Sequence, residues 1–132
     1  MTRINLLDPS LLTDQHLIAE YRELPRVFTL ALKAYGKPIK IPANYVLGTG
    51  HVKFFYNKLK FLEQRQNVLI QECKNRGFNV SFEKTDFIFP KSWYNDYIPS
   101  ETDIMLSKSR LDEKIAQKPD WYKYYGKKLE SK

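Results

Sequence analysis

Residues 14–35 read DQHLIAEYRELPRVFTLALKAY, and this stretch does most to decide the fold. Its apolar residues recur in steps of three or four, at Leu17, Tyr21, Leu24, Phe28, Leu32 and Tyr35. Such spacing predicts an α-helix with one apolar stripe facing a core. Thr13 or Asp14 is a suitable N-cap. Pro25 predicts a kink near residues 21–25, because proline lacks an N–H and clashes with the carbonyl four residues back.

Two further amphipathic helices are predicted, over residues 57–76 and 102–117. The inner stripe of the first comprises Leu59, Leu62, Gln66, Leu69, Ile70 and Cys73. Gly77 is a suitable stop for it. The second carries Ile104, Leu111 and Ile115 on one face and ends before Pro119.

The rest of the chain is predicted to be loop. Residues 36–56 and 78–100 are punctuated by Gly and Pro. Residues 79–83 alternate like a strand, but no partner strand is evident, and an isolated strand is marginal. We therefore predict an all-α fold, a single compact domain over residues 1–132 with three main helices and long irregular loops.

Charge points to a polyanionic partner. The net charge is +7, with nine Lys and Arg against two acidic residues in 27–76 and seven against four in 110–132. Lysine and arginine release condensed counterions from phosphates, so nucleic acid is a natural ligand, although a basic surface that is merely solvated has the same composition.

Cys73 is the only cysteine, which fits a reducing compartment. Neither a secretion signal nor a membrane span is evident, so we expect a cytoplasmic protein with no membrane partner.

Polar residues gather on the first helix, away from its apolar stripe. A projection at 100° per residue groups Gln15, Arg22 and Arg26 opposite the core, with His16 and Glu23 at the border. A carboxylate beside two guanidiniums and an imidazole is a suitable set of side chains for a functional site. An exposed helix with ordinary charge pairs would give the same pattern.

The C-terminal region repeats this theme. Arg110 and Lys114 lie one turn apart on the third helix, on a face away from Leu111 and Ile115, and could be a DNA contact or a solvated pair. The tail, WYKYYGKK over residues 121–128, interleaves rings with lysines. Its aromatics could stack on bases while lysines hold phosphates, or could close the core as a lid.

Conventional catalytic groups are not evident. Neither a metal-ligand spacing nor a Ser–His–Asp grouping occurs, and the turn at residues 48–51 does not join a strand to a helix as a phosphate-binding loop does. Removal of Met1 before the small Thr2 would expose an α-amine. Such an amine has a pKa of about 7.7–8.0, so a sizeable fraction is neutral and nucleophilic near pH 7. Many chains begin this way, and the residues alone do not select this nucleophile.

Four segments together carry a family resemblance: MTRIN at residues 1–5, DQHLIAEYRELPRVF at 14–28, VLGTGHVKFFYNKLKFL at 46–62 and SRLDEKIAQKPDWYKYYGK at 109–127. They resemble the phage pyrimidine-dimer DNA glycosylases of the dimer-specific endonuclease V type. The resemblance covers most of the chain. It weakens in residues 79–95 and after Lys127, and the loop at 34–42 is shorter than the family's.

The resemblance implies an all-α DNA-repair enzyme that needs no metal or cofactor. It would excise ultraviolet-induced cyclobutane pyrimidine dimers and then nick the strand as an abasic-site lyase. Thr2 would attack the sugar C1′ through its α-amine and form an imine, a Schiff base. Glu23 would stabilise the cationic sugar and shuttle protons during β-elimination.

The resemblance also implies a DNA-binding set. It comprises Arg3, Gln15, His16, Arg22, Arg26, Arg110 and Lys114, with Trp121, Tyr122 and Lys123 of the tail associated with dimer recognition. The expected partner is double-stranded DNA containing photoproducts or abasic sites, bound by a monomer. Two alternatives stay open: a non-catalytic binder of distorted DNA and a general abasic-site lyase.

Overall fold

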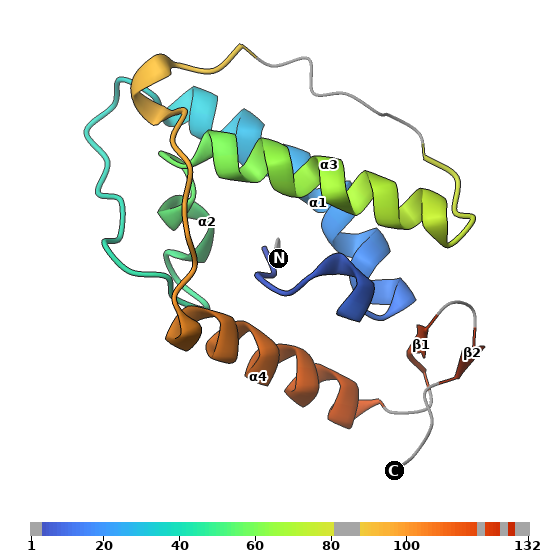
Figure 1. Cartoon of the computed structure of the whole chain (residues 1–132). Coiled ribbons are helices and arrows are strands. Elements are labelled where there is room, and N and C mark those ends of the chain that lie inside the picture. The colour runs from blue at the N-terminus through green and yellow to red at the C-terminus, as the bar shows by residue number, and fades with distance from the viewer. Residues whose placement is uncertain (1–3, 81–87, 119–120, 125–126, 129–132) are drawn as a thin grey trace.

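The computed structural model describes residues 4–80, 88–118, 121–124 and 127–128. In these residues three long helices dominate: α1 (Asp14–Ala34), α3 (Leu59–Asn75) and α4 (Glu101–Gln117), with the short α2 (His51–Phe54) before α3 (Figure 1). Short 3-10 helices span Pro9–Leu11 and Lys91–Trp93. The prediction of an all-α fold is confirmed. One two-residue strand pair, β1 (Lys123–Tyr124) with β2 (Lys127–Lys128), is added near the C-terminus.

Helix α1 begins as predicted, with the Thr13 side chain accepting a hydrogen bond from the backbone N–H of His16. It runs on through Pro25 to Ala34. Proline cannot donate to the carbonyl of Tyr21, four residues back. Instead, the buried Gln66 side chain of α3 donates to that carbonyl at 3.1 Å. This hydrogen bond explains why a polar residue, Gln66, occurs in the otherwise apolar inner stripe of α3.

Helix α3 begins two residues later than predicted and ends where the sequence indicates. Gly77 has a φ of +79°, the left-handed conformation that glycine favours after a helix. Its N–H donates to Lys74 and the N–H of Phe78 donates to Cys73, a Schellman closure of the last turn. Cys73 is buried, as its place in the apolar stripe predicts.

The core lies between α1 and α3, with the N-terminal segment running between this pair and α4 (Figure 1). Leu17, Tyr21, Leu24 and Phe28 are buried, which confirms most of the predicted stripe. The prediction was wrong at Tyr35, which is 47% exposed and lies beside Trp93, because α1 has by then passed the end of the core. On α4 only Ser107 and Leu111 are buried, so Ile104 at the other end of its apolar face is exposed.

Two arginines with buried side chains, one in α3 and one at its C-cap, fix the position of the chain before and at the start of α1. Arg65 forms a two-bond ion pair with Glu20 of α1 and also donates to the carbonyl of Leu7. Arg76 pairs with Asp14 and with Glu72, and donates to the carbonyls of Pro9 and Ser10. Because each guanidinium satisfies carboxylates and carbonyls together, the position of α1 and of residues 7–10 is set relative to α3.

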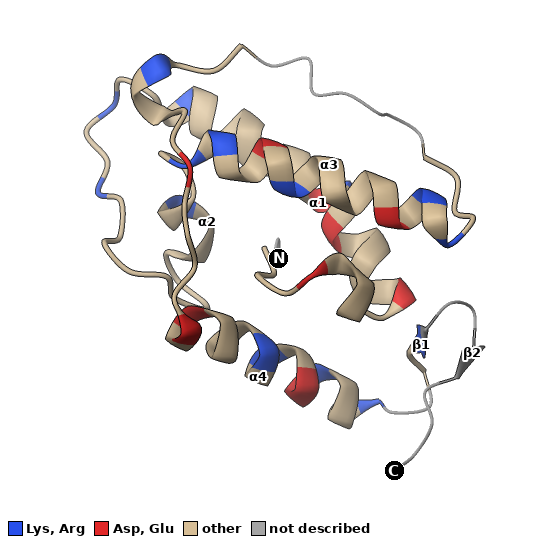
Figure 2. Ribbon diagram, viewed as in Figure 1, with Lys and Arg blue, Asp and Glu red and all other residues tan. Residues whose placement is uncertain are grey.

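The charge distribution of the sequence has a spatial counterpart. Figure 2 shows basic residues on the loop before α2, basic and acidic residues interspersed along α3, and acidic residues at the start of α4. Within the described ranges no helix is both long and apolar enough to cross a membrane.

Candidate active site

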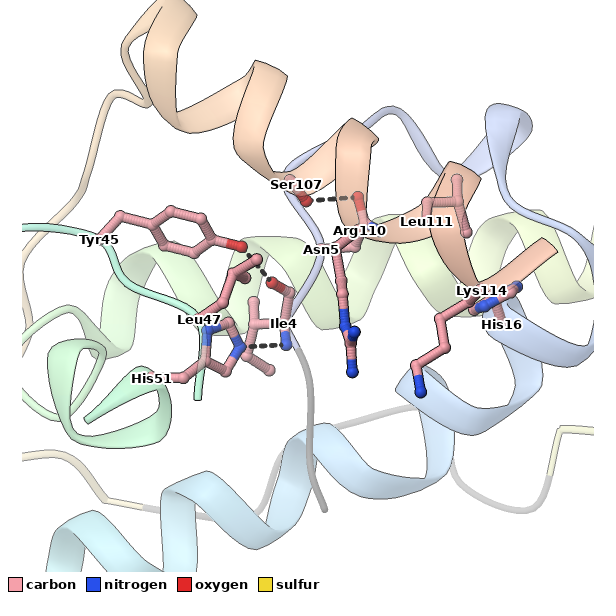
Figure 3. A pocket seen from close by; sticks show the side chains of 10 residues that line it. All are labelled: Ile4, Asn5, His16, Tyr45, Leu47, His51, Ser107, Arg110, Leu111 and Lys114. Carbon is pink, nitrogen blue, oxygen red and sulfur yellow. Dashed lines mark hydrogen bonds between the residues drawn. The ribbon is translucent and has the colours of Figure 1, made fainter. Parts of the chain in front are cut away.

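The site is built around the N-terminal segment, which two distant parts of the chain hold in place (Figure 3). The N–H of Ile4 donates to Nε2 of His51 at 2.8 Å, and the Tyr45 hydroxyl donates to the Ile4 carbonyl at 3.3 Å. On the α4 side, Oγ of Ser107 accepts from the N–H of Leu6 and donates to Oδ1 of Asn5, both at 3.0 Å. Residues 4–6 are therefore fixed between the α2 region and α4.

A cavity of about 140 Å³ opens beside this segment. Its lining comes from five parts of the chain: Ile4, Asn5, His16, Tyr45, Leu47, His51, Ser107, Arg110, Leu111 and Lys114. Figure 3 shows the Arg110 and Lys114 side chains extending from α4 in the same direction, between Ile4 and His16. The predicted separation of these two from Leu111 was wrong. Successive helical residues are only 100° apart, so Leu111 lies between their face and the core and lines the same cavity.

Arg110 is an unusual member of this lining. Its guanidinium lies 3.6 Å from Glu113, yet its Nε is buried and has no hydrogen-bond partner within the described part of the chain. A buried donor without an acceptor costs about 1–3 kcal/mol, more when it carries charge.

His16 forms the wall of the cavity on α1. Its ring stacks on Tyr122 with centroids 4.6 Å apart, and its Nδ1 lies 2.6 Å from the Thr13 hydroxyl. Burial, reinforced by the positive charge of Lys114, lowers the pKa of His16 to about 4. The imidazole is therefore neutral at physiological pH and adds no positive charge to the cations across the cavity.

The neutral His16 makes stability depend on pH. Between the ordinary pKa of 6.5 and the folded value of about 4, the unfolded chain takes up a proton that the folded chain does not, so stability falls as pH falls through this window. At pH 5 the loss relative to pH 7 should be about 1–2 kcal/mol, after allowance for partial exposure. Urea unfolding of the wild type and of His16→Phe, which keeps a ring against Tyr122, measures it. An equal drop in both proteins would show that His16 does not titrate in this way.

The tail is held against the start of α1 by Gln15. The Gln15 amide donates to the Trp121 carbonyl at 2.7 Å, and its Oε1 accepts from the N–H of Lys123 at 2.9 Å. Tyr122 is buried against His16, whereas Trp121 is 56% exposed and meets the edge of Tyr122. The two interpretations of the tail thus divide between neighbouring rings: Tyr122 closes the structure and Trp121 faces outward.

The predicted polar face of α1 continues from the cavity. Arg22 and Arg26 are exposed and Glu23 is half-buried, away from the buried stripe. Glu23 follows His16 by seven residues, which places it on the same side of the helix about 10 Å further along. In the described ranges the acidic residues of α1 that form ion pairs are Asp14 and Glu20, not Glu23. Arg22 lines a second cavity, of about 340 Å³, with Tyr21 and Gly77.

The structure brings some of the predicted site residues together and leaves others apart. His16, Arg110 and Lys114 meet in one cavity, with Gln15, Trp121, Tyr122 and Lys123 joined at its edge. Thr2 and Arg3 lie outside the described residues. Among those described, no cluster of three His, Cys, Asp or Glu side chains could hold a metal ion.

Sequence reasoning missed four contributors: Asn5, Tyr45, His51 and Ser107. His51 was treated only as part of a turn, although a histidine directly after Gly48–Thr49–Gly50 was a signal for a fixed ring position. The arrangement as a whole offers two cations and a neutral imidazole beside the N-terminal segment, with the Glu23 carboxylate about 10 Å further along α1. It is suited to an anionic sugar–phosphate ligand.

A comparison with known protein families gives a match to the pyrimidine dimer DNA glycosylase family over residues 1–86. The matched range includes the N-terminal segment, all of α1 and α3, and His51. Helix α4 and the tail lie beyond it. The match covers more than half of the chain, and the protein therefore belongs to the pyrimidine dimer DNA glycosylase family.

Proposed function

We propose that this protein excises cyclobutane pyrimidine dimers from DNA and then cuts the strand at the resulting abasic site, acting as a monomeric, single-domain enzyme. The family membership supports a DNA glycosylase for such dimers. The observation that carries the finer proposal is the cationic cavity beside the anchored N-terminal segment. It gathers Arg110, Lys114 and His16 around Ile4 and Asn5.

The nucleophile in this proposal is the α-amine of Thr2, after removal of Met1. Two residues of backbone span at most about 7 Å, so this amine can be presented only in the neighbourhood of Ile4 and its cavity. The amine nitrogen bonds to C1′ of the 5′ pyrimidine nucleotide as the glycosidic bond breaks, and the pyrimidine is released from this sugar while it stays joined to its dimer partner through the cyclobutane ring. Loss of a proton and opening of the sugar then give the imine, and β-elimination breaks the bond from C3′ to the phosphate oxygen.

Glu23 is assigned the proton transfers. Its carboxylate opposes the positive charge that develops on the sugar as the base leaves. It then takes the C2′ proton during elimination. The absence of an ion pair to Glu23 within the described residues, in contrast to Asp14 and Glu20, supports a role other than holding the helices together.

The remaining residues of the predicted set are assigned to DNA. Arg3, Arg22 and Arg26 would hold phosphates beside the cavity, and Arg110 and Lys114 within it, so affinity should fall steeply with salt, by about 0.9 in log–log slope per phosphate neutralised. The exposed Trp121 would stack on a base or a distorted step, while Gln15, His16, Tyr122 and Lys123 support the tail at the DNA-facing edge.

Nicking of supercoiled plasmid tests the function. Plasmid irradiated with ultraviolet light should be converted to nicked circles, to an extent that rises with dose, whereas untreated plasmid should stay supercoiled. Binding to irradiated plasmid without nicking would instead indicate a non-catalytic binder. Cutting of depurinated plasmid alone would indicate a general abasic-site lyase.

A further inference from the structure

The two ring nitrogens of His51 are both engaged, and their partners fix its state. His51 is 1% exposed. Its Nε2 accepts from the N–H of Ile4 at 2.8 Å, and its Nδ1 lies 2.8 Å from the carbonyl oxygen of Val46. A backbone N–H can only donate, so Nε2 must carry a lone pair and Nδ1 the proton. The ring is therefore held as the neutral tautomer that accepts from the N-terminal segment.

The surroundings of His51 hold this ring in one orientation. Gly50, with φ of +91°, turns the chain directly before it, and a side chain at Gly50 would come within 3.1 Å of Pro42. Tyr45 and Phe55 meet the ring edge-on at centroid distances of 5.5 and 5.6 Å. A packed ring in a tight turn gives its acceptor a fixed position.

Ile4 is the described residue nearest to Thr2, and both of its backbone polar groups form hydrogen bonds. Its N–H donates to His51, and its carbonyl accepts from the Tyr45 hydroxyl at 3.3 Å. The Ser107 contacts act further along, at Asn5 and Leu6. The hydrogen bond to His51 is therefore the last described anchor before the nucleophile, on the peptide that joins residue 3 to residue 4.

We propose that His51 is a positioning residue: its Nε2 holds the peptide of Ile4 so that the Thr2 amine meets C1′ in one geometry. This inference rests on the proposed function, in which that amine is the nucleophile. Reaction requires the joining atoms to lie about 3–3.5 Å apart, and a misplacement of 1 Å can cost about a hundredfold in rate. DNA affinity should depend little on His51, because all the residues assigned to phosphates except Arg3 lie on α1 and α4.

Two substitutions separate positioning from packing. In His51→Gln the amide oxygen reaches the place of Nε2 and can still accept from Ile4, whereas the bond to Val46 is lost. In His51→Asn the amide occupies the place of Nδ1 and can still donate to Val46, whereas the acceptor for Ile4 is lost. If His51 only fills the core, both substitutions should affect the rate of adduct formation to the same extent.

The experiment measures the rate at which borohydride-trapped adduct forms in a single turnover, with the protein in saturating excess over a dimer-containing duplex. The Kd for DNA and the thermal unfolding of each variant are measured alongside. His51→Asn should form adduct about 10- to 100-fold more slowly than the wild type, with its Kd within about twofold. His51→Gln should stay within about fivefold of the wild-type rate. Equal rates for a folded His51→Asn and the wild type, or equal slowing in both variants, would overturn the positioning role.

A second variant keeps the test decisive if His51→Asn does not fold. Tyr45→Phe keeps the ring and removes only the hydroxyl that donates to Ile4, and should slow adduct formation about two- to tenfold at unchanged Kd. An unchanged rate in Tyr45→Phe would then count against an anchored Ile4. Failure of the wild type itself to form an adduct is a separate outcome: it would remove the amine nucleophile, and with it the need for its positioning.

Discussion

Blocking the α-amine of Thr2 should reduce cutting of dimer-containing DNA by at least about a thousandfold. An acetylated amine is an amide, whose nitrogen lone pair is delocalised and does not attack C1′. Binding should change little, because the phosphates are assigned to Arg3 and to arginines and lysines of α1 and α4, whose side chains keep their charge. Protein acetylated only at its N-terminus, verified by mass spectrometry, would be compared with unmodified protein in single-turnover cutting and in a DNA-binding titration.

The matched control is Thr2→Ala. Alanine is also small, so Met1 should still be removed and a primary α-amine should remain. This variant should cut at a rate close to that of the wild type, which separates the amine from the threonine hydroxyl. If the acetylated protein cuts at the wild-type rate, the nucleophile is a lysine Nζ, and Lys114 in the cavity would be the first to test.

Glu23→Gln should lower the cutting rate by about 10²- to 10⁴-fold while DNA binding is retained or strengthened. Glutamine has nearly the same shape but neither opposes the charge on the sugar nor accepts its proton. Removal of one negative charge beside Arg22 and Arg26 favours phosphate binding, so the Kd should stay equal or fall. Single-turnover cutting and a binding titration at the same salt concentration measure the two effects separately.

Glu20→Gln is the matched control on the same helix. Glu20 is buried in its ion pair with Arg65, so its replacement should lower the free energy of unfolding by about 1–3 kcal/mol. Cutting per folded molecule should stay close to the wild-type rate. A Glu23→Gln protein with full activity, or a Glu20→Gln protein as inactive as Glu23→Gln, would remove Glu23 from its assigned role.

Much of the fold could be predicted from local patterns. Most of the stripe of α1, the Thr13 cap and the Gly77 stop depend on residues within one or two turns, and these were confirmed. The bounds of α4 were predicted to within one residue, but burial of Ile104 on its apolar face was not found, because this helix buries only Ser107 and Leu111. Tyr35 was assigned to the core because periodicity indicates a face and not how far the neighbouring helix extends.

The candidate site could be predicted only in part. Projection of one helix groups Arg22, Glu23 and Arg26, since their relation is local. It cannot bring Arg110 to His16 or set His51 against Ile4, because those pairs are joined by tertiary packing across large separations in the chain. The choice of the Thr2 amine came from the family resemblance.

The most direct measurement is reduction with borohydride during the reaction, followed by peptide mapping of the trapped adduct. An imine between protein and DNA is reduced to a stable amine, which preserves the point of attachment. We expect a covalent complex with dimer-containing duplex, absent with undamaged duplex, whose DNA fragment maps to the N-terminal peptide at the α-amine of Thr2. Cutting without a trapped complex, or an adduct that maps to a lysine side chain, would contradict this expectation.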